Sequence, residues 1–252
     1  MRGASLVLLV VLGPAIPTQV MPAQSRGLGA ARISNADIND DGSVRIEFKT
    51  GRSIRIPMVK GQAGRDKLQV AVSGKMVGWL EVDGPVGSYS VPTTLTVYTV
   101  GKPLRHFSGY RAMLLDWGFI DDDRRIQFSS SAVHGRESER RTVEVLDLAT
   151  GRLVERWSDG WDSDVTVAEV RGMVTSGDGV PLPDTVVSSD AALTTSDEHG
   201  HFVLRGISPG QHELRLEHPR FKGRAIQIAV GSSGEAVEAG SIALERQPRV
   251  TK

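Results

Sequence analysis

The chain has no cysteine, few aromatic residues and no excess of either charge. Its 252 residues include 5% Phe, Trp and Tyr, with 30 Lys plus Arg and 30 Asp plus Glu. Without cysteine there is no disulfide framework, thiolate metal site, cysteine nucleophile or lipid-modified cysteine. A net charge of zero argues against nucleic-acid binding through bulk positive charge. Stability must therefore come from packed apolar cores.

One long apolar run stands at the start of the chain and is typical of a secretory signal peptide. Arg2 precedes the apolar residues 6–12, and Gly13 and Pro14 end the run. A membrane anchor is the alternative, but a spanning helix needs about 20 apolar residues. We expect residues 1–23 to be a signal peptide, and the remaining chain to be periplasmic or extracellular, with no membrane span. An exported chain without cysteine fits a bacterial envelope.

The rest of the sequence indicates an all-β fold. Apolar and polar residues alternate in short bursts, as at 44–48 and 94–98, which is the period of half-buried strands. The 28 glycines and 12 prolines supply turns between the bursts, and no sustained helical stripe is present. The length suits roughly two domains of about 100–150 residues.

A repeat runs through the first domain, which we place at residues 30–157. Gly51, Gly101 and Gly151 recur every 50 residues, each followed by a basic residue. Each glycine predicts a hairpin turn with positive φ. Paired strand bursts upstream of the second and third hairpins predict two four-stranded units after one leading hairpin.

Residues 145–153 resemble the hairpin between the third and fourth strands of a β-propeller blade. A propeller needs about four blades to close, and this domain supplies fewer. Either the units pair with another chain, or they form an open sandwich that uses the blade motif. A third interpretation is that the 50-residue spacing is accidental, because hairpin turns with glycine are common.

A different pattern begins after a linker at residues 158–164. Pro183 stands in a stiff extended stretch, Asp197 and Gly200 form a turn, Phe202 begins an inward alternation, and Gly210 supplies another turn. Residues 165–246 resemble the carboxypeptidase regulatory-like domain. The resemblance implies a seven-stranded, transthyretin-like β-sandwich that acts as a non-catalytic accessory domain. Residues 247–252 are a tail.

An acidic loop near the start of the first domain resembles a calcium loop. Asp37, Asn39 and Asp41 occupy its first, third and fifth positions, and Gly42 its sixth. The twelfth position should be glutamate and is Phe48. The loop is therefore either a calcium site or an ordinary acidic turn. We expect no other cofactor.

Three further residues are candidates for binding. His199 and His201 flank Gly200, and one acidic neighbour could complete a metal site, although a histidine pair alone lacks a third ligand. Their alternative role is as ordinary turn residues. Trp161 lies in the linker and is the best candidate for an exposed aromatic contact.

The sequence favours recognition over catalysis. It has no Gly-x-Ser-x-Gly elbow and no glycine-rich phosphate loop. We expect a non-catalytic protein that binds another envelope or surface protein, with open sheet edges as the mechanism. The alternatives are a carbohydrate-binding module, with a saccharide as ligand, and an accessory subunit of a secreted hydrolase.

Overall fold

The computed structural model describes residues 31–84, 90–111, 113–133, 140–160, 167–190, 192–232 and 234–247. Within these ranges every regular element is a β-strand, which confirms the all-β prediction. The described residues contain no helix of the length and apolar character that crossing a membrane requires. The predicted signal peptide and Trp161 lie outside the described residues.

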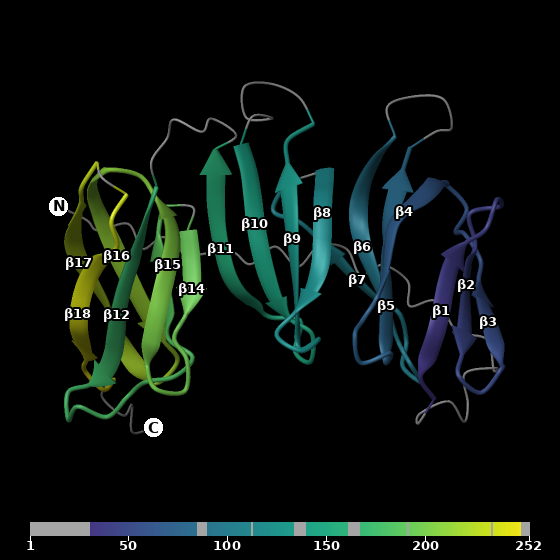
Figure 1. Cartoon of the computed structure of the whole chain (residues 1–252). Helices are drawn as coiled ribbons and strands as arrows, with labels where there is room; N and C mark the ends of the chain where they lie inside the picture. Colours follow the sequence, from purple (N-terminus) through teal and green to yellow (C-terminus); the bar gives the residue numbers. More distant parts are fainter. Residues whose placement is uncertain are drawn as a thin grey trace, which may run out of the picture.

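The N-terminal part consists of three antiparallel sheets in which consecutive strands pair. The first contains β1 (Ile33–Ile38), β2 (Val44–Phe48) and β3 (Ser53–Ile56). The second contains β4 (Gln62–Val70), β5 (Met76–Asp83), β6 (Val91–Thr99) and β7 (Arg105–Ser108). β8 (Met113–Ile120), β9 (Arg125–Ser131), β10 (Arg140–Asp147) and β11 (Leu153–Gly160) follow in the third. The three sheets stand face to face in a row, called here the sheet stack (Figure 1).

The middle sheet of the stack has two buried faces, because apolar side chains that alternate along its strands point to both sides. On β5, Trp79 belongs to the core shared with β1–β3, whereas the next residue, Leu80, belongs to the core shared with β8–β11. On the facing sheets, Phe48 fills the first core and Trp117 the second. Both tryptophans are therefore core residues.

The repeated glycines lie in corresponding hairpins of the three sheets. Gly51 joins β2 to β3 with φ of 79°, Gly101 joins β6 to β7 with φ of 76°, and Gly151 joins β10 to β11 with φ of 75°. These values lie in the left-handed region, which glycine enters without the Cβ penalty. The leading hairpin gains one further strand, β1, so the first sheet has three strands.

The C-terminal part is a sandwich built from strands β12 to β18. One layer has the order β15 (His201–Ile207), β12 (Ala168–Ser176) and β18 (Val237–Leu244), with β12 and β18 parallel. The other has β17 (Phe221–Val230), β16 (Gly210–His218), β13 (Val186–Ser189) and β14 (Ala192–Thr195). Phe202, Leu204, Leu214 and Leu216 fill the core between the layers.

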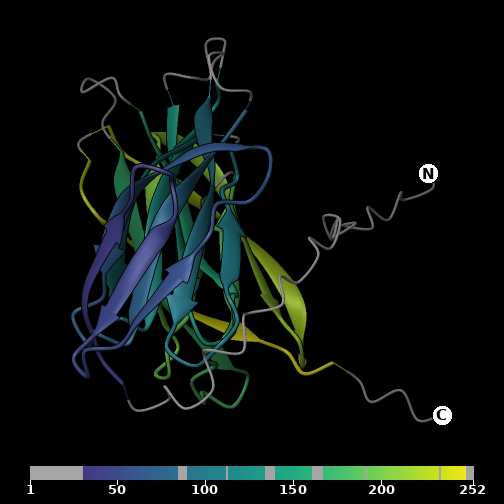
Figure 2. The same cartoon turned by 90° about the vertical axis from the view of Figure 1, so that its right-hand side faces the viewer.

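The second layer of the sandwich continues into the sheet stack. β14 pairs with β11 at Leu193 and Arg156, so a single eight-stranded sheet runs from β17 to β8. β11 extends to Gly160, into the range predicted as linker. Close by, β15 approaches β11 so tightly that a Cβ at Gly206 would lie 2.8 Å from the carbonyl oxygen of Ser158. Figure 2, viewed along the row, shows the sheets overlapping one behind another.

Polar contacts between residues about 50 positions apart in the sequence connect the second and third sheets. The Trp117 indole Nε1 donates to the carbonyl oxygen of Lys67 at 2.8 Å. The buried carboxylate of Asp123 accepts hydrogen bonds from the backbone N–H groups of Val72 at 3.3 Å and Ser73 at 2.7 Å. The sequence spacing of the repeat thus reappears as contact between successive sheets.

Asp123 allows a test of this connection. Asp123→Ala removes both hydrogen bonds and places alanine at φ of 63°, so we expect the free energy of unfolding to fall by about 2–4 kcal/mol. Asp122→Ala is the control for backbone strain, because Asp122 has φ of 52° and is exposed. Asp122→Ala should lower the free energy of unfolding by about 1 kcal/mol. Urea denaturation measures both, and equal losses would contradict a role for the Asp123 carboxylate.

Candidate functional site

The outer strands of the sheets are the surfaces through which this fold could bind another chain, because they carry unpaired backbone groups. The outer edge of β8 is covered by side chains from β4. Lys67 Nζ donates to the carbonyl oxygen of Leu115 at 2.5 Å, and Gln69 Nε2 donates to that of Trp117 at 2.8 Å. A partner strand would have to displace both side chains.

Other outer strands are protected in different ways. At the end of β3, Arg65 donates to the carbonyl oxygens of Ile56 at 2.9 Å and Pro57 at 2.8 Å. β4 is interrupted by two irregularities of register, and Lys67 within it has φ of 49°. On β18, the Arg224 guanidinium donates to the carbonyl oxygen of Ala243 at 2.8 Å. β7 has four residues and is the shortest outer strand of its sheet.

β17 is the longest of the outer strands and is open along most of its length. At its start, Lys222 N–H donates to the carbonyl oxygen of Glu245 at 2.7 Å. Beyond this point, no hydrogen bond between described residues reaches the backbone of residues 223–230 from outside β16. We call residues 223–230 the β17 edge. In Figure 1, β17 lies at the opposite end of the row from β1–β3.

The two faces of the β17 edge differ. Ile228 and Val230 are buried in the sandwich core, and Ile226 is partly buried against it. Between them, Ala225, Gln227 and Ala229 are exposed. From Ile226 to Val230, an added strand would therefore find apolar side chains on the core side and small or neutral ones on the outer side, whereas Arg224 is the charged residue of the core side.

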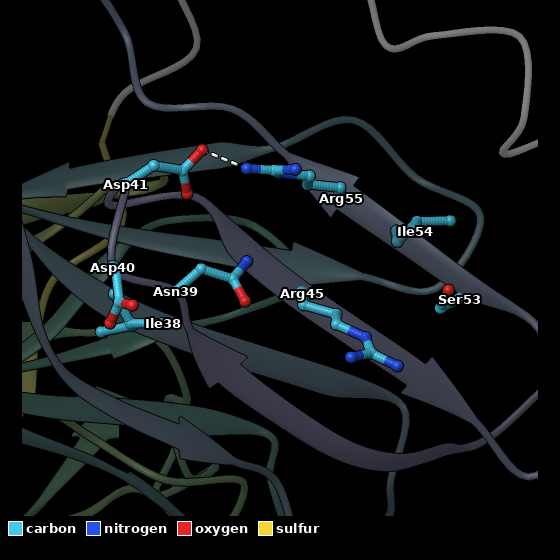
Figure 3. A pocket seen from close by; sticks show the side chains of 8 residues that line it. All are labelled: Ile38, Asn39, Asp40, Asp41, Arg45, Ser53, Ile54 and Arg55. Atoms are coloured by element: carbon cyan, nitrogen blue, oxygen red, sulfur yellow. Dashed lines mark hydrogen bonds and ion pairs between the residues drawn. The ribbon is translucent and has the colours of Figure 1, made fainter.

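The sheet of β1–β3, at the end of the stack away from the sandwich, has a charged outer face. An open hollow lies on it (Figure 3). Arg45 and Arg55 are cross-strand neighbours on β2 and β3. Each has a carboxylate partner: Arg45 lies 2.5 Å from Glu47, and Arg55 contacts Asp41. These exposed ion pairs give a solvated surface rather than a further packing face. The stack therefore ends here without needing another sheet on this side.

Of the predicted calcium-loop residues, Asn39 and Asp41 border this hollow and Asp37 does not, and their side chains have separate partners. Asp37 accepts a hydrogen bond from Asn35 Nδ2 at 2.6 Å. Asn39 Nδ2 donates to the Ser43 hydroxyl at 2.8 Å, and Asp41 accepts from that hydroxyl at 2.6 Å. Hydrogen bonds from the hydroxyl and the backbone N–H of Ser43, the hydroxyl being the largest cause, lower the pKa of Asp41. The arrangement is that of an acidic turn closed on its own serine.

A groove of about 770 Å³ lies between the third sheet and the sandwich. Charged side chains line it, and we call it the junction groove. Arg152 lies 3.4 Å from Asp184 across it, and Arg205 pairs with Glu155 and lies 3.3 Å from Glu169. The Arg205 guanidinium also covers the ring of Trp157 at 5.7 Å. Opposite charges are thus paired within the groove.

His201 and Asp197 line the junction groove, but the two predicted histidines do not converge on a metal position. The His199 and His201 rings are 6.5 Å apart and exposed. Asp197 Oδ1 instead accepts from the backbone N–H groups of His199 at 2.9 Å and His201 at 2.8 Å. Within the described residues, no cluster of three or more His, Asp or Glu is placed to hold a metal ion.

The remaining predicted motif residues lie in turns and in the core. Gly200 has φ of 78°, and a Cβ there would lie 2.4 Å from the carbonyl oxygen of Val174. Gly210, with φ of 138°, begins β16, and Pro183 lies in the exposed turn before β13. Phe202 is buried. These residues shape the sandwich and do not form a binding constellation.

No sequence motif points to a polar cluster in the second sheet, in which Glu81 and Thr96 are buried and His106 is exposed. Thr96 Oγ1 lies 2.8 Å from His106 Nδ1, and Glu81 lies 3.9 Å from the same nitrogen. A nucleophile–histidine–acid relay needs two different ring nitrogens, and Thr96 is fully buried. The cluster came together through the pairing of β5, β6 and β7, which no local motif encodes.

The C-terminal sandwich matches the carboxypeptidase regulatory-like domain. The family model covers residues 169–245, and it confirms the resemblance that the C-terminal sequence carries. The blade resemblance of the N-terminal part has no such support and stays a prediction.

Two individual proteins are also similar. "Structural protein 27" of a virus (isolate Australia/Victoria) is 24% identical over 120 residues, which is 48% of this chain and 23% of the viral protein. The chain thus spans less than a quarter of that relative. A 3-chlorocatechol 1,2-dioxygenase structure from Rhodococcus opacus 1CP is 13% identical, covering 34% of this chain and 62% of its own, with a TM-score of 0.28. That TM-score is too low to support any inference.

The hairpin that borders the junction groove has a pH-dependent contact. Asp147 accepts hydrogen bonds from the backbone N–H of Thr150 at 2.7 Å and its hydroxyl at 2.8 Å, and the first of these is the main cause of a lowered pKa for Asp147. A carboxylate with a lowered folded-state pKa stabilises the fold above its unfolded value of about 3.9, and this is lost as the pH falls.

We therefore expect Asp147→Asn to be less stable than the wild type at pH 6, with the difference shrinking as the pH falls below about 4. Urea denaturation at several pH values measures it. Asp178→Asn, at an exposed turn residue, is the control. A difference between wild type and Asp147→Asn that stays constant down to pH of about 2 would contradict this linkage.

Proposed function

We propose that this protein is a non-catalytic recognition component that binds another envelope or surface protein through its sheet surfaces. The observation that carries the proposal is the open β17 edge, in a molecule whose β8, β3 and β18 edges are occupied by Gln69, Arg65 and Arg224. Natural proteins usually block their edges, so a long open strand favours pairing with another chain.

The comparisons support a non-catalytic role without naming a partner. A regulatory-like sandwich is compatible with an accessory protein, and so is similarity to a viral protein described as structural. Opposite charges in the junction groove are paired with each other, which also fits a structural contact better than a reaction centre. We further propose, from the N-terminal sequence pattern, that the protein is exported to the periplasm or the extracellular space.

Saccharide binding and service as a hydrolase subunit are weaker alternatives. A sugar platform needs clustered exposed aromatic rings. Among the described residues, Tyr110 is the one aromatic side chain with large exposure, and Arg156 covers its ring at 4.4 Å. Trp79 and Trp117 are buried. No specific contact in the described structure favours either alternative.

The proposal is tested by capture of a partner with the tagged chain and an edge variant. Ala229→Lys adds a charge at the open strand, whereas Ala149→Lys makes the same change at an exposed turn. After a salt wash of native envelope extract, we expect wild type and Ala149→Lys to retain the same stoichiometric protein. Ala229→Lys should retain at least about tenfold less. Mass spectrometry identifies the bound protein.

Equal retention by all three chains would overturn the role of the β17 edge. Retention of no protein by the wild type would overturn protein recognition and favour saccharide or small-solute binding. Circular dichroism of Ala229→Lys checks that the variant keeps its strand content.

A further inference from the structure

The β17 edge has a sequence that reads almost the same in both directions. Residues 225–229 are Ala-Ile-Gln-Ile-Ala, a palindrome centred on Gln227. It extends outward to Gly223 and Gly231, with Arg224 and Val230 as the one unmatched pair. An antiparallel pair of identical strands places residues at equal distances from the centre opposite each other. In such a pair, each of residues 225–229 would lie opposite a residue of the same type.

We propose that the β17 edge pairs with the β17 edge of a second copy of this chain, antiparallel and centred on Gln227. The inference rests on the proposed function, because it assumes that this edge is a pairing surface, and it names the partner. The contact is isologous, so a single two-fold axis closes it as a dimer. The two eight-stranded sheets then form one continuous sheet.

The two faces of the strand agree with this register. Ile226 of one copy lies opposite Ile228 of the other, and both point to the core side, where they extend the apolar core of each sandwich. On the outer side, Ala225 faces Ala229, and Gln227, whose Nε2 donates to Glu213 on β16 at 3.4 Å, lies opposite its own copy. A shift by one residue would set core-side residues against outer-side residues and lose this match.

Charges do not oppose the pairing. Arg224 of one copy lies opposite Val230 of the other, and Lys222 lies opposite Ser232, so no like charges are directly cross-strand. Arg224 is already directed to the carbonyl oxygen of Ala243 on β18. Small side chains at Ala225 and Ala229 leave the outer face of the edge flat, which suits close approach of a second strand.

Residue 227 provides a charge-swap test, because at the centre of the pair it faces itself. Gln227→Lys places two lysines opposite each other, and Gln227→Glu places two glutamates there, so both variants should weaken dimerisation by at least about tenfold. An equimolar mixture of the two should restore it, since lysine then faces glutamate. Sedimentation equilibrium at about 1–100 µM chain, where weak dimers dissociate, measures the effect.

Gln211→Lys is the matched control. Gln211 is exposed and lies opposite Ala229 on β16, one strand in from the edge. We expect it to dimerise like the wild type. A monomeric wild type throughout this range overturns self-pairing, and so does a dimer that both Gln227 variants leave unchanged. Failure of the mixture to recover would overturn the register centred on Gln227.

The outcomes separate this inference from the proposed function. A monomeric wild type that captures a foreign protein, with loss of capture in Ala229→Lys, keeps the β17 edge as a pairing surface and overturns self-pairing. A monomer whose capture is unaffected by Ala229→Lys overturns both. The chain contains no cysteine, so Gln227→Cys adds a single thiol. A short bifunctional maleimide should link it across the dimer, whereas Gln211→Cys should remain unlinked.

Discussion

Unpaired backbone at the margin of a β-sheet is the constraint around which this molecule is organised. Stacking hides the faces of a sheet but leaves its outer strands with free N–H and C=O groups. In the sheet stack, long polar side chains of β4 bond to these free backbone groups. Lys67 and Gln69 donate to carbonyl oxygens of β8, and Arg65 donates to a carbonyl oxygen at the end of β3. These contacts also fix how one sheet lies against the next. The same hydrogen bonds therefore protect the sheet edges and hold neighbouring sheets in position.

The two ends of the row are each closed in a different way. At one end, ion pairs such as that of Arg45 with Glu47 make a solvated face, and the row needs no further sheet there. At the other end the sandwich joins through β11 and β14, and Gly206 permits the close approach. Three sheets therefore suffice without ring closure. The longest outer strand, β17, stays open along residues 223–230 at the far margin of the eight-stranded sheet, and both proposals about function start from it.

Much of the fold could be predicted from local patterns. The glycines 50 residues apart mark the hairpins because positive φ is a local requirement, and the C-terminal turns around Gly200 and Gly210 identify the sandwich. The site was harder to predict. Asp37, Asn39 and Asp41 have calcium-like spacing, yet Ser43 and Asn35 satisfy their side chains, and spacing alone does not encode such competing partners. The palindrome around Gln227 was visible in the sequence, but its meaning depends on that strand standing at an edge.

The sequence by itself determined which segments are strands, where they turn, and which residues alternate toward a core, because these depend on the period of two and on the φ of single residues. The tertiary structure alone decided which strands are neighbours beyond those joined by the hairpins. The pairing of Arg156 with Leu193 joins two domains into one sheet, and Gln69 of the second sheet donates to the backbone of Trp117 in the third. Such contacts depend on the packing of whole sheets, so only the assembled fold shows that β8 is covered and β17 is open.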